Sequence, residues 1–261
     1  MQHSARLATR VGLIALLLSA ISSTAYATSY LATPEPLSFV NVTAVGTVLT
    51  GLTNQDDTAV GLALPFTFRF FDTDYTSLSV SSNGLITFGG GDTTFTNADL
   101  TTSPDLAAIA PFWDDLHTAG GLPGSDVYTA TLGAPGSRQF VIQWNQIRFF
   151  SGGTAGDTIT FEAVLFEGSN NIRFSYLDLI SGSAAGNNGA SATVGIKDAG
   201  TQGPNRLLLA FNNGPNAFVG SEHSTLLTRQ SADVVPEPAT LTLVGIGVLA
   251  GLRRRFTGPR K

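Results

Sequence analysis

The sequence predicts an all-β protein whose central part folds as a single, jelly-roll-like β-sandwich. Short runs of alternating apolar and polar residues recur between segments rich in turn-forming residues. Gly, Ser, Thr, Asn and Phe are abundant, whereas Lys and Glu, which usually cover helix surfaces, are scarce. We find no internal repeat or linker over 28–221, and we expect a last strand and a tether over 221–235. Residues 28–235 are therefore predicted to form one domain.

Residues 1–27 have the pattern of a secretory signal peptide, a helix that is later removed. Two arginines supply the positive start, residues 11–21 form an apolar run, and Ala25 and Ala27 fit the small-residue cleavage rule. The alternative is a transmembrane helix, but this apolar run is too short to cross a bilayer. We therefore expect cleavage after Ala27 and export across the inner membrane.

Residues 236–261 contain three ordered elements: a Pro-Glu-Pro triplet, a short apolar segment and an arginine cluster. As a helix, the apolar segment 239–252 would cover ~21 Å, against ~30 Å of bilayer hydrocarbon, so it would be a marginal anchor. By the positive-inside rule, the arginines stay in the cytoplasm and the bulk of the chain lies outside. The residues of the triplet and the cluster are Pro236, Glu237, Pro238, Arg253, Arg254 and Arg255.

This arrangement resembles the PEP-CTERM sorting signal of exported bacterial proteins. The resemblance implies an exosortase-type processing enzyme in the membrane, which recognises and removes the tail. The protein would be anchored transiently in the inner membrane by its C-terminal hydrophobic helix, and would then reach the cell surface or the extracellular space. The alternative is an ordinary short helix that closes the domain, although three arginines do not normally follow a core helix at once.

Composition excludes several classes of function. The predicted domain holds seven basic and eighteen acidic residues, a net charge of −11, so it has little with which to neutralise phosphates and no nucleic-acid partner is expected. The chain has no cysteine, which excludes disulfides, thiolate catalysis and cysteine-ligated zinc. Only His117 and His223 remain in the domain, which leaves little for a histidine-based metal site or a catalytic triad.

The first predicted strands surround two turns. Phe66, Phe68 and Phe70 alternate with polar residues, so the three rings should face the core. A turn is expected at 72–74 and a return strand at 78–81. Asn83-Gly84 is a strong signal for a tight turn into a strand at 85–88. The next strand, 109–116, contains Pro111, which favours an edge strand or a strand start.

Later strands follow the same alternation. Trp144 shares a face with residues 140 and 142, whereas Ile147 and Phe149 have the opposite parity, so a bulge near Asn145-Gln146 is expected to turn both sets inward. Over 159–165 the odd-numbered residues should face the core, while Glu162 faces outward. Strands at 172–176, 194–197 and 207–211 complete the series.

The ordered series of these segments resembles the nidogen-type extracellular domain over about 64–197. The matching segments are Leu64–Phe71, Val80–Gly89, Ile109–Leu116, Phe140–Trp144, Phe161–Gly168, Asn171–Phe174 and Thr193–Ile196. The resemblance implies a β-rich extracellular module of matrix and adhesion proteins, with no catalytic residues to carry over. This chain departs from the pattern because it has no cysteines and no accompanying cysteine-rich modules.

Asp114 and Asp115 are the candidate metal ligands, because hard cations such as calcium prefer carboxylate oxygens. The competing interpretation is that one aspartate caps a turn, and it is favoured because adjacent strand residues point to opposite faces. Asp56-Asp57, and Asp72 with Asp74, are predicted to form turns. No other cofactor is expected.

We therefore expect a non-catalytic, exported surface or extracellular-matrix protein, associated with exopolysaccharide or biofilm, or adhesive. The alternative is a carbohydrate- or cation-binding module. Trp113, Trp144 and Tyr176 could stack on sugars, although their apolar neighbours favour core packing. A glycan hydrolase is the third hypothesis, and it requires two converging carboxyl groups, for which Glu162 and Glu167 are the candidates.

Overall fold

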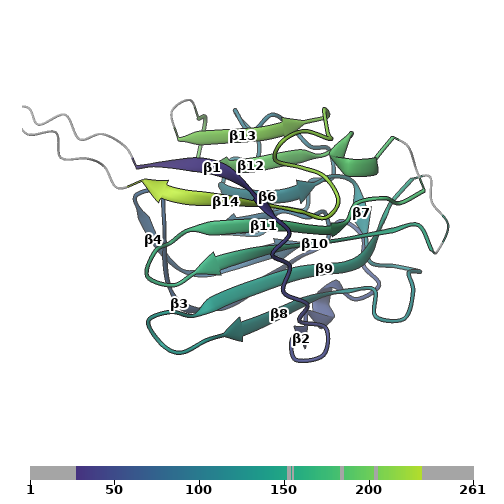
Figure 1. Ribbon diagram of the computed structural model, residues 1–261, viewed down its shortest axis with the longest axis horizontal. Coiled ribbons are helices and arrows are strands. Elements are labelled where there is room, and N and C mark those ends of the chain that lie inside the picture. Colours follow the sequence, from purple (N-terminus) through teal and green to yellow (C-terminus); the bar gives the residue numbers. More distant parts are fainter. Residues whose placement is uncertain (1–27, 152–153, 155, 183–184, 203–204, 231–261) are drawn as a thin grey trace, which may run out of the picture. The chain divides into compact units, whose positions relative to one another are not determined.

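Two antiparallel β-sheets make up the fold, as the sequence predicts (Figure 1). The computed structural model describes residues 28–151, 154, 156–182, 185–202 and 205–230. Over these residues the larger sheet has eight strands and the smaller sheet has six. Two short 3-10 helices, η1 (Thr50–Leu52) and η2 (Asn187–Gly189), also lie within them.

The spatial order of the strands differs from their order along the chain. The larger sheet contains, from edge to edge, β1 (Ser29–Pro36), β14 (His223–Gln230), β11 (Ile172–Asp178), β10 (Thr158–Phe166), β9 (Gln139–Phe149), β8 (Asp126–Leu132) and β2 (Thr47–Val48), and β7 (Leu116–His117) also pairs with β9. The smaller sheet contains β13 (Arg206–Phe211), β12 (Thr193–Lys197), β6 (Ala107–Trp113), β5 (Ile86–Phe88), β4 (Thr73–Ser81) and β3 (Ala59–Phe70).

Short turns decide how the strands are connected. Strand β3 returns as β4 after Phe71 and Asp72, and β10 returns as β11 after residues 167–171. A chain that reverses within so few residues pairs with the strand it has just left. Both sheets are therefore built largely from sequential neighbours, β3 to β6 and β8 to β11. This strand order differs from the predicted jelly-roll-like connectivity.

One aromatic core is shared by the two sheets, which makes the fold a sandwich. Trp144 of β9 stacks on Phe161 of β10, with ring centroids 5.0 Å apart. The Trp144 indole Nε1 donates a hydrogen bond of 3.0 Å to the Ser81 carbonyl of β4, and the Tyr176 hydroxyl of β11 donates one of 3.0 Å to the Pro111 carbonyl of β6. Trp144 and Tyr176 are fully buried in this core, and Trp113 is fully buried in a second apolar cluster with Leu85 and Leu100, as their apolar neighbours predict.

Several register shifts interrupt the strand pairing around this core, and two of them bear on the sequence predictions. The predicted bulge near Asn145-Gln146 is confirmed: Trp144 pairs with Phe161 but Ile147 pairs with Ile159, which leaves one extra residue on β9, and Gln146 has a φ of 52°. The prediction that Pro111 marks an edge strand or a strand start is wrong, because β6 lies between β5 and β12 and begins at Ala107. The pairing of β6 with β12 shifts between Ala110 and Trp113, so Pro111 lies in an irregular stretch of the ladder.

The outer face of the larger sheet is covered by the chain that follows β1. This segment, residues 37–46, crosses β11, β10, β9 and β8 before it reaches β2, and we call it the strap (Figure 1). Val40 N donates to both carboxylate oxygens of Glu162, at 3.1 and 3.2 Å, and Val42 N donates to Gln143 Oε1 at 2.8 Å. Glu162 does face away from the core, as predicted, but the strap buries it completely.

Among the described residues, no helix reaches the length and apolarity needed to cross a membrane. The predicted signal helix and C-terminal hydrophobic helix lie outside the described residues.

Glu162 makes the stability of the domain depend on pH. Burial raises its pKa from 4.5 to about 8, and the Val40 hydrogen bond and the charge of Arg173 oppose this only in part. The folded protein thus holds one more proton than the unfolded chain between about pH 4.5 and 8. Over that window the free energy of unfolding should fall as pH rises, by up to ~1.4 kcal/mol per pH unit, and should level off above it.

Glu162→Gln should remove this slope and make the domain more stable than wild type above pH 8, since the amide oxygen still accepts from Val40. Urea unfolding at pH 5 to 9 measures the effect. Glu222→Gln, at an exposed position, is the matched control and should keep the wild-type slope. Equal slopes for wild type and Glu162→Gln would show that Glu162 is not the group responsible.

Candidate functional site

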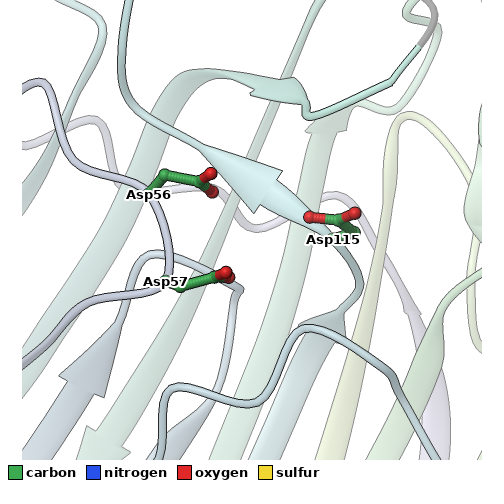
Figure 2. A group of neighbouring side chains, drawn as sticks. All are labelled: Asp56, Asp57 and Asp115. Atoms are coloured by element: carbon green, nitrogen blue, oxygen red, sulfur yellow. The ribbon is translucent and has the colours of Figure 1, made fainter.

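Three aspartates from two distant segments converge at one place (Figure 2). Asp56 and Asp57 lie between η1 and β3, and Asp115 lies between β6 and β7. Each of the three carboxylates has an oxygen within 4.8 Å of an oxygen of the others. We call these residues the aspartate cluster.

A buried asparagine holds the two segments of the cluster together. The Asn83 side chain donates through Nδ2 to Asp57 Oδ1 at 2.9 Å and accepts through Oδ1 from Leu116 N at 2.9 Å. The Asn83 carbonyl also accepts from Asp114 N at 3.2 Å. Gly84 follows at a φ of 70°, and a Cβ there would lie 1.9 Å from the Phe112 carbonyl oxygen. The predicted Asn83-Gly84 turn therefore forms, and it also positions the cluster.

Asp114 does not join the cluster. Its Oδ1 accepts from Asp115 N at 2.9 Å and its Oδ2 accepts from Ser191 Oγ at 2.5 Å, so its carboxylate lies against the segment before β12. Burial raises the pKa of Asp114, and the two hydrogen bonds offset part of that rise. The structure thus separates the predicted pair: Asp115 faces Asp56 and Asp57, while Asp114 accepts a hydrogen bond from Ser191.

Sequence reasoning assigns the other two members of the cluster to a turn and misses their convergence with Asp115. The chain bends at Asp57, which has a φ of 45°, while Asp56 pairs with His117 in an isolated bridge, and the Asp57 carboxylate remains exposed beside Asp115. Two adjacent-acid pairs, separated by more than fifty residues, are visible in the sequence. Their convergence depends on the Asn83 bridge, which residue spacing alone does not reveal.

Like charges make the aspartate cluster unfavourable without a partner. Burial, followed by the charge of Asp57, raises the pKa of Asp56. Burial and then the charges of Asp56, Asp57 and Asp114 raise the pKa of Asp115. Nearby, burial and Arg148 lower the pKa of His117. Among the described residues, Asp56 Oδ1 is shielded from solvent and has no hydrogen-bond partner. This chemistry suits a hard cation, which would take three carboxylate oxygens here and the rest of its ligands from water or backbone carbonyls.

The two glutamates considered for hydrolysis are engaged elsewhere. Glu162 is buried under the strap, where it accepts from Val40 N. Glu167, just after β10, forms a 2.7 Å ion pair with Arg138, whose hydrogen bonds are the largest cause that lowers its pKa to about 2. The predicted cleavage residues Ala25 and Ala27, and the sorting residues Pro236, Glu237, Pro238, Arg253, Arg254 and Arg255, lie outside the described residues.

Comparison with known proteins gives two family matches. The family described as NIDO related matches residues 29–239, and the PEP-CTERM protein-sorting motif matches residues 234–255. Mouse alpha-tectorin is 27% identical over 171 residues, and human alpha-tectorin is 26% identical over the same length. Each alignment covers 56% of this chain and only 8% of the relative. No solved structure matches.

The sorting motif indicates export, transient anchoring in the membrane by the C-terminus, and a final location at the cell surface or outside the cell. The NIDO match covers most of the sandwich domain, which agrees with the nidogen-type resemblance of the sequence. The chain belongs to the NIDO-related family and carries a PEP-CTERM sorting motif at its C-terminal end.

Proposed function

We propose that this protein is a non-catalytic component of the cell surface or extracellular matrix, delivered there by exosortase-type processing. The observation that carries the proposal is the order of a complete sandwich followed at once by the sorting motif: β14 ends at Gln230 and the motif begins at residue 234. The proposed division is a signal peptide over 1–27, a sandwich over 28–235 and a removable tail over 236–261.

A non-catalytic role is supported by how the described carboxylates are used. Glu162 and Glu167 are held by the strap and by Arg138, and Asp114 is held by Ser191. Association with exopolysaccharide or biofilm, or an adhesive role, is the finer part of the proposal. It is supported by the surface location and by the family match, and its test is whether the processed protein sediments with the extracellular matrix.

Replacing Pro236, Glu237 and Pro238 by alanines tests the sorting step. We expect the native protein to lose its arginine-rich tail and leave the inner membrane, because the processing enzyme recognises the triplet. The alanine variant should keep its full C-terminus and remain in the inner-membrane fraction. Intact mass and cell fractionation measure both outcomes.

The matched control replaces Pro34, Glu35 and Pro36 of β1, a second Pro-Glu-Pro triplet that the sequence offers outside the tail. That variant, if it folds, should be processed normally. If the native protein and the 236–238 variant both keep the tail, the C-terminus is a permanent anchor and the proposal fails.

A second candidate function is cation binding, and the aspartate cluster is the specific observation that favours it. The carbohydrate-binding alternative receives less support, because Trp113, Trp144 and Tyr176 are buried. A shallow groove of about 430 Å³ on β3, β4 and the segment after β5 is lined by glycine, alanine, serine and leucine residues and offers no aromatic ring for stacking on a sugar.

Calcium should raise the unfolding temperature of the wild-type protein and should have little effect on Asp115→Asn. In EDTA, Asp115→Asn should have a higher unfolding temperature than wild type, because the substitution removes repulsion with Asp56 and Asp57. Asp178→Asn, exposed at the end of β11, is the control and should respond to calcium as wild type does. Thermal unfolding with calcium or EDTA checks both signs. A wild-type unfolding temperature that calcium leaves unchanged would contradict the cation site.

A further inference from the structure

The first described residue, Thr28, is bound by an aspartate from the β3–β4 turn. Although it precedes β1, Thr28 is only 2% exposed. Its backbone N donates to Asp72 Oδ2 at 3.2 Å and its Oγ1 donates to Asp72 Oδ1 at 2.5 Å. The hydrogen bond from the Thr28 hydroxyl is the largest cause that lowers the pKa of Asp72. The sequence predicts Asp72 only as a turn residue, and a turn does not account for these two contacts.

The last strand also reaches this position. Arg229 of β14 donates through its NH2 group to Thr28 Oγ1 at 3.1 Å and to the Phe71 carbonyl at 2.7 Å, and it lies 3.8 Å from Asp72 Oδ1. The beginning of the described chain, the β3–β4 turn and the end of β14 therefore meet in one polar group. We call Thr28, Asp72 and Arg229 the terminal clamp.

We propose that the terminal clamp is a binding site for the mature N-terminus, in which Asp72 pairs with the α-ammonium group of Thr28. The inference rests on the predicted cleavage after Ala27. Hydrolysis by a signal peptidase adds one water across the Ala27–Thr28 peptide bond, which leaves a carboxylate on Ala27 and an ammonium group on Thr28. The amide offers one uncharged donor to Asp72, whereas the ammonium offers three donors and a full positive charge.

The charges around the clamp leave Asp72 available for this second cation. The Arg229 guanidinium lies 3.8 Å from Asp72 Oδ1, but its hydrogen bonds go to the Phe71 carbonyl and the Thr28 hydroxyl. Arg69 is paired with Asp74 at 3.1 Å on the same hairpin. Arg69 of β3 and Arg229 of β14 are thus the positive charges that act on Asp72, and Asp74 of β4 is the negative charge paired with Arg69. Half of the Asp72 side chain is exposed, so solvent weakens the pair without removing it.

Removal of the signal peptide would then contribute to the final fold. Before cleavage, the clamp holds a neutral amide. After cleavage, it holds an ion pair at the point where β1 begins its pairing with β14. The exported form of the domain would be more firmly closed at this edge than the precursor.

The test uses the protein purified after export and compares wild type, Asp72→Asn and Asp74→Asn. Intact mass first identifies the N-terminal residue, which should be Thr28. Acetylation of the α-amine by limiting acetic anhydride, followed by mass spectrometry of the N-terminal peptide, then gives the pKa of the amine. The chain suits this labelling because its only lysines are Lys197, which is fully buried, and Lys261 in the tail.

In wild type the pKa of the amine should lie above the ordinary range of about 7.7–8.0, because the ammonium form is stabilised by Asp72. At pH 7.5 the amine of Asp72→Asn should react at least about threefold faster, whereas Asp74→Asn should react as wild type does. Equal rates in all three proteins would overturn the inference. If Asp72→Asn does not fold, a wild-type pKa at or below the ordinary range overturns it equally. A mature N-terminus other than Thr28 also overturns it, and leaves the proposed surface role standing.

Discussion

The pairing of β1 with β14 is the interaction on which the rest of the domain depends. The two strands are in register from Ser29 opposite Gln230 to Pro36 opposite His223. This pairing brings together residues that are almost as far apart in the chain as the domain allows. Strand β1 is an edge strand, so it tolerates prolines that cannot donate to a further neighbour. Its direction sends the following residues across the outer face of the sheet.

That crossing explains why the outer face of the larger sheet is not a simple solvated surface. The backbone of the strap donates to the side chains of Glu162 and Gln143. At Ser38 it also donates to the Ser224 hydroxyl of β14 and accepts from the Ser175 hydroxyl of β11. Val42 packs with Tyr128, Val141 and Val164 in a small apolar cluster of its own. The sandwich thus has a second, thinner layer of packing on one side. Polar residues in that layer are buried because the strap satisfies them, and a buried polar group without a partner would be costly.

Local patterns predict the strands well, because each depends on neighbours in the sequence. Alternation identifies the inward residues of β3, β9 and β10, and the change of parity after Trp144 identifies the bulge. The features that local patterns miss depend on distant contacts. Glu162 is covered by a segment more than a hundred residues away, and that segment has no periodicity of its own. Pro111 suggests an edge because a donor is missing there, but an irregular ladder also tolerates a missing donor.

The aspartate cluster also depends on distant contacts that local sequence patterns do not reveal. Adjacent aspartates are recognisable in the sequence, yet which of them meet depends on Asn83, whose side chain joins the loop before β3 to the start of β7. Asp114 and Asp115 lie in the bend between β6 and β7 and point in different directions, and only Asp115 reaches the cluster. The sorting motif, by contrast, is a linear signal, and it is recognisable from the sequence alone.

We expect the strap and the β1–β14 edge to open and close together with the rest of the sandwich in the exported protein. Amide hydrogen exchange of the exported protein tests this most directly. We predict that the amides of Val40 and Val42, which donate to buried side chains, exchange as slowly as those of β1 and β14. If the strap amides exchange at the rate of an exposed loop while β9 and β10 stay protected, the strap opens independently of the sandwich and the account is wrong.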